Sequence, residues 1–454
     1  MQILLIVLPS LLALGSPGRA GAKTGVGVPA VLAEFDRLAA RPLWPGFDPG
    51  STPLEIFDGE RTWLVRHPRP PAGFLPARGR SDAVVVSGRH GTVRANTSVA
   101  VGGVATATAS FEGLAGNDRR LAALLLHEAF HVFQARRHPK WGGNEAELFV
   151  YPVENPETLA LRRIESLAFA RALESTNPGG RASWAGRAIE ARRARFARLP
   201  PGAAEFERGT ELKEGLARYI EVLAVHESAP LFSEAEFAAD RVRVRAYASG
   251  AAMALLLDVL DPAWKPELEQ RDEPLDVILG RAVAGVPGAA LSGEEEASIR
   301  SRAKRDVAAW AESRASLRNT FLSEAGWTLV LECNSPLFPQ GFDPLNVERL
   351  SEGSVLHTRW LKLGNAEGTF EVLGRRCLTE AAGKHPLFEG VRRVSVAGLP
   401  EEPRTDVGEG EGEGGLRVTA PGLTLAFRNA RISRNGRTVT VTLGGGSPPP
   451  LAPR

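Results

Sequence analysis

The clearest chemical feature of the sequence is a pair of histidines four positions apart, His127 and His131. On a helix, residues i and i+4 share one face, so both imidazoles could bind one cation. Glu128 follows the first histidine and could take a proton from a water bound to that cation. Only eight histidines occur in 454 residues, and two of them packed without partners on a Leu- and Ala-rich helix would be costly. The spacing therefore predicts a zinc site with a general base.

The residues around this motif favour a helix. Asn117 and Asp118 are candidate caps, and residues 119–126 contain no helix breaker. We expect the helix to end near His138, because a proline follows it. We interpret His138 as a surface residue at the helix end and not as a metal ligand.

A zinc site with an open position needs a third protein ligand. The best candidate is Glu214, because an apolar stripe on its segment leaves the acidic residues on a different face. Gly215 beside it has no side chain, which suits close approach to a second helix, although glycine costs a helix about 1 kcal/mol relative to alanine. The alternative interpretation is an ordinary amphipathic helix whose charges are solvated.

The two segments, HEAFH and EGLARY, resemble the gluzincin branch of the zinc metallopeptidases, the thermolysin-like clan. The resemblance covers about residues 80–265. It implies that His127, His131 and Glu214 bind zinc. It also implies that Glu128 is the general base and that the substrate is a peptide or protein.

The sequence departs from this family in two places. Between the histidine pair and the expected glutamate lie 82 residues, more than in compact members of the clan. An inserted helical stretch would explain the gap, but Glu165 could be the ligand instead. Arg218 stands where some relatives place an acid that orients a ligand histidine, so that role would pass to Glu211 or Glu221.

Hydrolysis of this kind also needs a donor to the oxygen that becomes negatively charged. The resemblance implies a Tyr or His beyond the third ligand, and Tyr247, which has small neighbours, is our candidate. Tyr247 could instead be a core residue, and His226 is the competing donor. We expect Tyr219 to pack beneath the site.

The net charge of +2, with mixed signs along the chain, does not indicate nucleic acid or an anionic membrane surface as a partner. We interpret the arginine-rich run at residues 187–198 as the solvated face of a helix. After the N-terminal segment, no stretch is long and apolar enough for an integral membrane helix.

Residues 1–22 have the pattern of a signal peptide, with an apolar run, a Gly-Ser-Pro break and small residues suited to cleavage. No Lys or Arg precedes the apolar run, and a short anchor or a mis-assigned start is the alternative. We expect an exported protein, periplasmic or secreted. In that setting Cys333 and Cys377 could form a disulfide, or remain two buried thiols.

The element pattern predicts an α+β protein. Residues 23–322 form the expected metallopeptidase-like domain, with a small β-rich part at 50–110 and a helical part at 115–322. Residues 323–446 form a β-rich accessory domain of unknown ligand, and 447–454 are a Pro-rich tail.

The sequence thus predicts a zinc-dependent hydrolase of peptide bonds, with Glu128 and Tyr247 in catalytic roles. A non-catalytic, peptidase-like binding protein that keeps a metal for structure is the alternative. Glu128 argues against it, because a structural metal site has no use for a base. No clamp for a terminal amine or carboxylate is evident, so endo- and exopeptidase action both stay open.

Overall fold

The computed structural model describes most of the chain after the expected signal peptide. The described residues are 27–93, 96–112, 114, 117–225, 231–232, 238–343, 346–351, 353–381, 383, 385, 387–407 and 415–444. Residues 1–22, the candidate donor His226 and the Pro-rich tail lie outside them. The described chain divides into two compact units, one of residues 27–144 and 153–306, the other of Glu145–Pro152 and the chain from Val307 onward. The division falls inside a long helix, whereas the sequence placed a boundary after residue 322.

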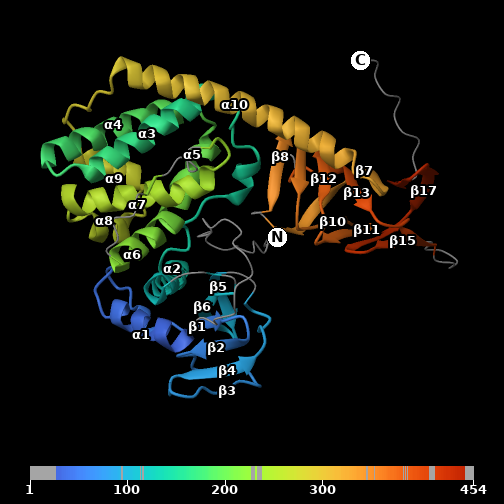
Figure 1. Cartoon of the computed structure of the whole chain (residues 1–454), viewed down its shortest axis with the longest axis horizontal. Coiled ribbons are helices and arrows are strands. Elements are labelled where there is room, and N and C mark those ends of the chain that lie inside the picture. The colour runs from blue at the N-terminus through green and yellow to red at the C-terminus, as the bar shows by residue number, and fades with distance from the viewer. Residues whose placement is uncertain are drawn as a thin grey trace. The chain divides into compact units, whose positions relative to one another are not determined.

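A six-stranded sheet forms the first part of the N-terminal unit (Figure 1). Its strands are β1 (Leu54–Phe57), β2 (Arg61–Val65), β3 (Leu75–Pro76), β4 (Ala83–Ser87), β5 (Thr97–Val101) and β6 (Val104–Ser110), in the order β3-β4-β2-β1-β6-β5. Strands β1 and β6 are parallel, and the other pairs are antiparallel. The β5–β6 hairpin turns at Gly102 and Gly103, which both have positive φ angles, a conformation that glycine adopts without strain.

Helix α2 (Asp118–Arg137) carries the histidine pair and packs on β5 and β6. Its start is capped by the Asn117 side chain, which accepts a hydrogen bond from the backbone N–H of Arg120 at 2.9 Å. The helix ends at His138, as expected, but His138 is not a surface residue. Its side chain is only 4% exposed and lies between the carboxylates of Glu269 and Asp272, which belong to helix α8 (Trp264–Arg271) and its C-terminal cap.

The rest of this unit is helical, as expected. Its helices are α1 (Val28–Ala39), α3 (Pro156–Glu174), α4 (Pro178–Phe196), α5 (Pro201–Thr210), α6 (Leu216–Val225), α7 (Val242–Leu260), α8 (Trp264–Arg271), α9 (Leu275–Ala282) and the first part of α10 (Gly293–Leu322), with a short 3₁₀ turn at Pro49–Ser51. Helices α5 and α6 are joined without a break by a single π-helical segment, η3 (Glu211–Gly215). The chain from Pro201 to Val225 is therefore one continuous helix that contains a single π-helical turn.

An aromatic cluster fixes the helices that flank the histidine pair. The ring of Trp44 makes edge contacts with Phe130 on α2, Tyr219 on α6 and Trp264 on α8. All four side chains are buried in the same hydrophobic core. Such aromatic pairs contribute about 0.5–1.5 kcal/mol beyond their burial. The cluster therefore holds α2 and α6 together behind their polar faces.

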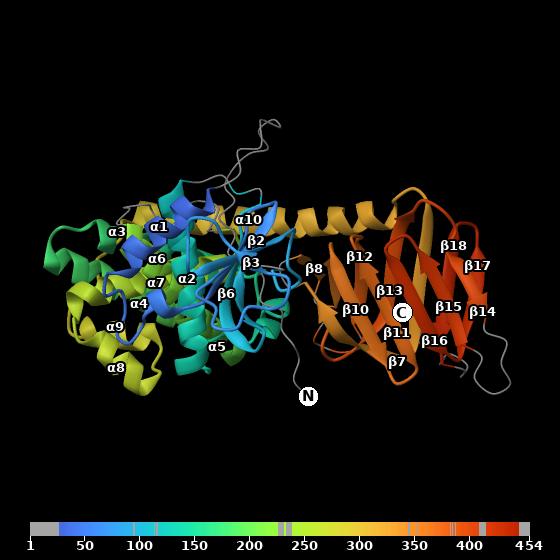
Figure 2. The same ribbon diagram turned by 90° about the horizontal axis from the view of Figure 1, so that it is seen from below.

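The second unit is built from strands after the end of α10, as expected from the sequence. They are β7 (Trp327–Phe342), β8 (Val347–Ser351), β9 (Ser354–His357), β10 (Trp360–Asn365), β11 (Gly368–Leu373), β12 (Cys377–Ala381), β13 (Val391–Leu399), β14 (Arg404–Val407), β15 (Gly415–Ala420), β16 (Leu423–Arg428), β17 (Ala430–Asn435) and β18 (Thr438–Leu443). Figure 2 shows these strands side by side. The pairs are antiparallel except β7 with β18. Together with the N-terminal sheet and the helices, they make the protein α+β.

The long strand β7 pairs with different neighbouring strands along its length. Its first part pairs with β13 and β18, and its last part, which includes Phe342, pairs with β10. The hydrophobic core of this unit also includes Phe149, which belongs to the short helix η2 (Glu145–Phe149) that follows α2 in the chain. Cys333 and Cys377 are buried in this core as free thiols, so the disulfide is absent and the alternative interpretation holds. Burial raises the pKa of the Cys333 thiol to about 12.

No helix in the described ranges has the length and apolar composition needed to cross a membrane.

Candidate metal centre

Three side chains predicted as zinc ligands meet in the N-terminal unit. His127 and His131 project from α2, and Glu214 projects from η3. Glu214 Oε2 lies 3.6 Å from His127 Nε2 and 3.3 Å from His131 Nε2. Zinc bonds of about 2.0 Å in tetrahedral geometry place neighbouring donors about 3.3 Å apart. Two imidazoles and one carboxylate, at these separations, are a donor set that fits zinc, so the residues could hold a metal ion.

Each histidine is oriented by a partner on its other ring nitrogen. Nδ1 of His127 pairs with the carboxylate of Glu221 on α6, and Nδ1 of His131 lies 2.8 Å from Oε1 of Gln134. Because both partners accept hydrogen bonds, they favour a proton on each Nδ1, which would leave each Nε2 lone pair for a bound metal. Of the two acids expected to orient a histidine, Glu221 contacts His127, whereas Glu211 pairs with Arg192 and Ser249.

The charge of these acids dominates the ionisation of His127. Burial lowers the pKa of its imidazole, but the carboxylates of Glu221, Glu214 and Glu128 outweigh burial and raise the pKa to about 10. The Glu214 carboxylate shows the reverse effect, because the histidines and Arg243 hold its pKa well below 4.5 despite burial. A cation is therefore favoured where these groups meet.

Gln134 on α2 links this helix to η3 by hydrogen bonds. While its Oε1 faces His131, its Nε2 donates hydrogen bonds to the carbonyls of Leu212 and Lys213, both at 3.0 Å. These carbonyls belong to the π-helical turn that carries Glu214. Single π turns of this kind are frequent at functional sites. Sequence reasoning missed Gln134, although its position three residues after His131 on the same helix face was the available signal.

The glycine beside Glu214 has the role that its position suggested. A Cβ on Gly215 would lie 2.6 Å from the Cα of Gly250 on α7. The two glycines therefore allow η3 and α7 to touch at their backbones. This contact brings the first turns of α7 next to Glu214.

Two side chains of α7 reach the metal centre. Arg243 donates from Nη2 to Glu214 Oε1 at 3.1 Å, and from Nη1 to the hydroxyl of Tyr247 at 2.8 Å. The Tyr247 ring stacks on the His127 ring at a centroid distance of 6.1 Å and an angle of 15°. Tyr247 thus lies beside the candidate ligands, and its role as a donor stays a prediction. Arg243 was not predicted, and nothing in its local sequence distinguishes it from neighbouring arginines.

Glu128 has no exposed surface and follows the first ligand on α2. Its negative charge contributes to the raised pKa of His127, so it acts on the same centre. Tyr219, expected beneath the site, is fully buried in the aromatic cluster around Trp44. Its hydroxyl donates to Asp258 at 2.6 Å and is committed away from the metal ligands.

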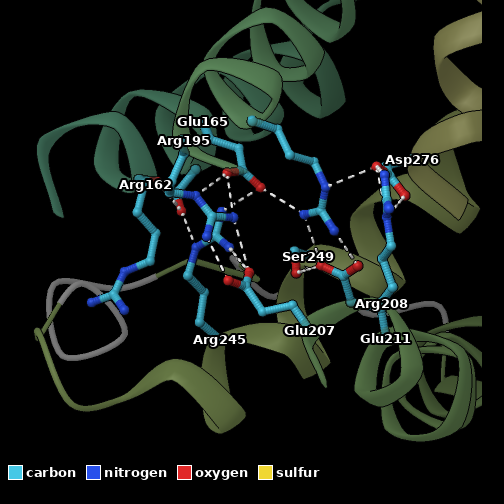
Figure 3. A network of polar contacts seen from close by, with 11 residues as sticks. Arg162, Glu165, Arg195, Glu207, Arg208, Glu211, Arg245, Ser249 and Asp276 are labelled. Atoms are coloured by element: carbon cyan, nitrogen blue, oxygen red, sulfur yellow. Dashed lines mark hydrogen bonds and ion pairs between the residues drawn. The ribbon is translucent and has the colours of Figure 1, made fainter. Parts of the chain in front are cut away.

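Glu165, the alternative ligand, lies in a different cluster, shown in Figure 3. Its carboxylate binds Arg192 at 2.8 Å, Arg195 at 2.8 Å and Arg245 at 2.8 Å. The buried charged residues of this cluster, here called the arginine network, are Glu165, Arg192, Arg195, Glu207, Glu211, Arg245 and Asp276. Glu165 is therefore a structural carboxylate, whose own charge is matched by surrounding guanidinium groups.

The arginine network corrects the interpretation of residues 187–198 as a solvated face. Arg192 and Arg195 on α4 are 1% and 0% exposed. They turn inward because the acids on α3, α5 and η3 line the opposite side. Buried charges are stable only when paired in this way. Glu211 joins the network to the metal centre along the chain, because it lies in the same π-helical turn as Glu214.

Comparison with known proteins gives no relative for this chain. No family model matches the chain, and neither the curated proteins nor the solved structures contain a match. Membership of the gluzincin clan therefore stays a prediction from the two motifs.

Proposed function

We propose that the protein is a zinc-dependent hydrolase of peptide bonds. The observation that carries the proposal is the arrangement of His127, His131 and Glu214. Both Nε2 atoms face one carboxylate oxygen, and both Nδ1 atoms are held by separate partners. With three protein ligands, a tetrahedral metal keeps one position for water, which is the pattern of catalytic and not structural zinc sites.

The residues around the ligands supply the remaining chemistry. When bound there, zinc would lower the pKa of its water to about 7 and polarise a substrate carbonyl. Glu128 would accept a proton from the attacking water as the C–O bond forms. It would then pass that proton to the amide nitrogen, and the C–N bond breaks as the amine leaves. Tyr247 donates its hydroxyl proton toward the oxygen that carries negative charge in the transition state.

The second candidate is a peptidase-like binding protein with a structural metal. It is favoured by burial, because His127 and Glu128 have no exposed surface. Against it stands Glu128 as a candidate general base, since a structural metal site has no use for a base.

The test compares purified wild type with Glu128→Gln, using the exposed Glu174 as the matched control, Glu174→Gln. Each protein is loaded with zinc, its metal content is measured, and it is incubated with a peptide library read by mass spectrometry. We expect all three to hold one zinc, and Glu128→Gln to lose about 10²–10⁴-fold in rate. Equal cleavage by wild type and Glu128→Gln would contradict the mechanism. Zinc without cleavage in every sample would favour the binding protein.

A further inference from the structure

The two oxygens of the Glu214 carboxylate have different partners. Oε2 is the oxygen near both ligand histidines, at 3.3 Å and 3.6 Å. Oε1 accepts a hydrogen bond from Arg243 Nη2 at 3.1 Å. The carboxylate is thereby oriented with one oxygen toward the metal centre and the other toward α7.

Arg243 is itself held in place. Its guanidinium lies 5.4 Å from the centre of the Tyr247 ring and donates to the Tyr247 hydroxyl, while that ring stacks on His127. Arg243 is only 9% exposed. A buried cation beside a metal centre repels the metal ion, so this position costs binding energy. An orienting role would offset that cost.

We propose that Arg243 is a positioning residue that keeps Glu214 a one-oxygen ligand and so preserves an open coordination position for water. The inference rests on the proposed metal centre, but not on any particular substrate. A carboxylate with both oxygens available can bind a cation through both, which would fill the position that catalysis requires. With Oε1 engaged by Arg243, only Oε2 is presented.

This role has an unusual consequence. Replacing Arg243 by a neutral residue removes the repulsion and frees Oε1, so the metal should bind more tightly while its coordination number rises. A merely structural role predicts the opposite, because a loosened site binds metal more weakly. Arg243→Lys keeps the positive charge and a donor, and should therefore restore the behaviour of the wild type.

The experiment uses Co²⁺ as a spectroscopic substitute for zinc. The full-length chain is stripped with a chelator and titrated with Co²⁺ alone. Visible absorption reports the coordination number, because four-coordinate Co²⁺ absorbs more strongly than five- or six-coordinate Co²⁺. The variants are Arg243→Met, Arg243→Gln and Arg243→Lys, and the control is Arg241→Met, which changes an exposed arginine at the start of the same helix. Circular dichroism checks that each variant is folded.

We expect weaker absorption and a Kd for Co²⁺ at least about tenfold lower in the neutral variants, with wild-type values in Arg243→Lys and Arg241→Met. If one of the two neutral variants does not fold, the other one is sufficient to test the role of Arg243. Wild-type absorption, or weaker binding, in the neutral variants would overturn the role of Arg243 while the metal centre stands. A wild type that binds no stoichiometric Co²⁺ would instead overturn the metal centre, and this inference with it.

Discussion

Glu221 binds the Nδ1 nitrogen of His127 across the contact between α6 and α2. Glu221 lies seven residues beyond Glu214 on the same continuous helix. One continuous helix thus carries the candidate ligand Glu214 and also holds the candidate ligand His127 of α2. Arg218 donates to the second oxygen of Glu221, so the arginine that seemed to break the family pattern supports the acid that performs the orienting role.

Removing the Glu221 carboxylate should weaken the metal centre without removing a ligand. We expect Glu221→Ala to lower zinc affinity about 10–100-fold, because His127 loses the partner that fixes its tautomer and ring orientation. Competition with a chromophoric chelator measures the change, and Glu174→Ala, at an exposed site, is the control. Unchanged affinity would mean that the contact with Glu221 does not orient a ligand.

The identity of the third ligand can be decided by metal content. We expect Glu214→Ala to lose most of its zinc, because only two protein donors remain. Glu165→Ala should keep zinc but lower the free energy of unfolding, because it leaves the arginines around it without their carboxylate. Elemental analysis and urea unfolding of both variants separate the two acids. Full zinc retention in Glu214→Ala would rule out our assignment.

The sequence alone could place the two candidate histidine ligands on one face of a helix, because their spacing is local. His127 and His131 needed only the period of a helix, and Gly215 marked the place where two helices could touch. The orienting groups were harder to predict. Glu221 stayed one of two alternatives, since a π turn changes which residues of a helix share a face, and no sequence pattern shows that turn.

The arginine network shows the second limit of the sequence. Arg192 looks like any solvated arginine, because charged residues are almost never fully buried unless paired. Its partners Glu165 and Asp276 lie 27 and 84 positions away, so the pairing depends on how α3, α4 and α9 pack. His138 was misjudged for the same reason, since Glu269 comes from a helix far along the chain.

The arginine network should make folding sensitive to acid. Although burial acts to raise the pKa of Glu165, Arg195, Arg245 and Arg192 outweigh it and hold the pKa far below 4.5. The stability from this carboxylate is therefore present above about pH 4.5 and is lost as the pH falls toward the folded-state pKa. We expect the wild-type free energy of unfolding, measured with urea between pH 7 and pH 3, to fall steeply below pH 4.5.

Arg195→Met provides the matching variant. It should cost about 3–5 kcal/mol at pH 7, because Glu165 and Glu207 lose a shared partner in a buried site, and its stability should vary less between pH 5 and pH 3. Arg193→Met, at an exposed position of the same helix, is the control and should behave as the wild type. An equally steep acid dependence in Arg195→Met and wild type would place its origin outside the network.

Tyr247 is the residue whose catalytic role most needs a test. Burial, and then the Glu214 carboxylate, raise the pKa of its phenol well above 10, so the hydroxyl keeps its proton at neutral pH and can donate. We expect Tyr247→Phe to lower turnover about 100-fold or more with unchanged zinc content. The matched control is Tyr219→Phe, which removes a buried hydroxyl bound to Asp258 and should lower stability but not turnover. If Tyr247→Phe retains turnover and His226→Ala loses it, the donor is His226. If neither variant loses turnover, the oxyanion is stabilised by a group other than these two.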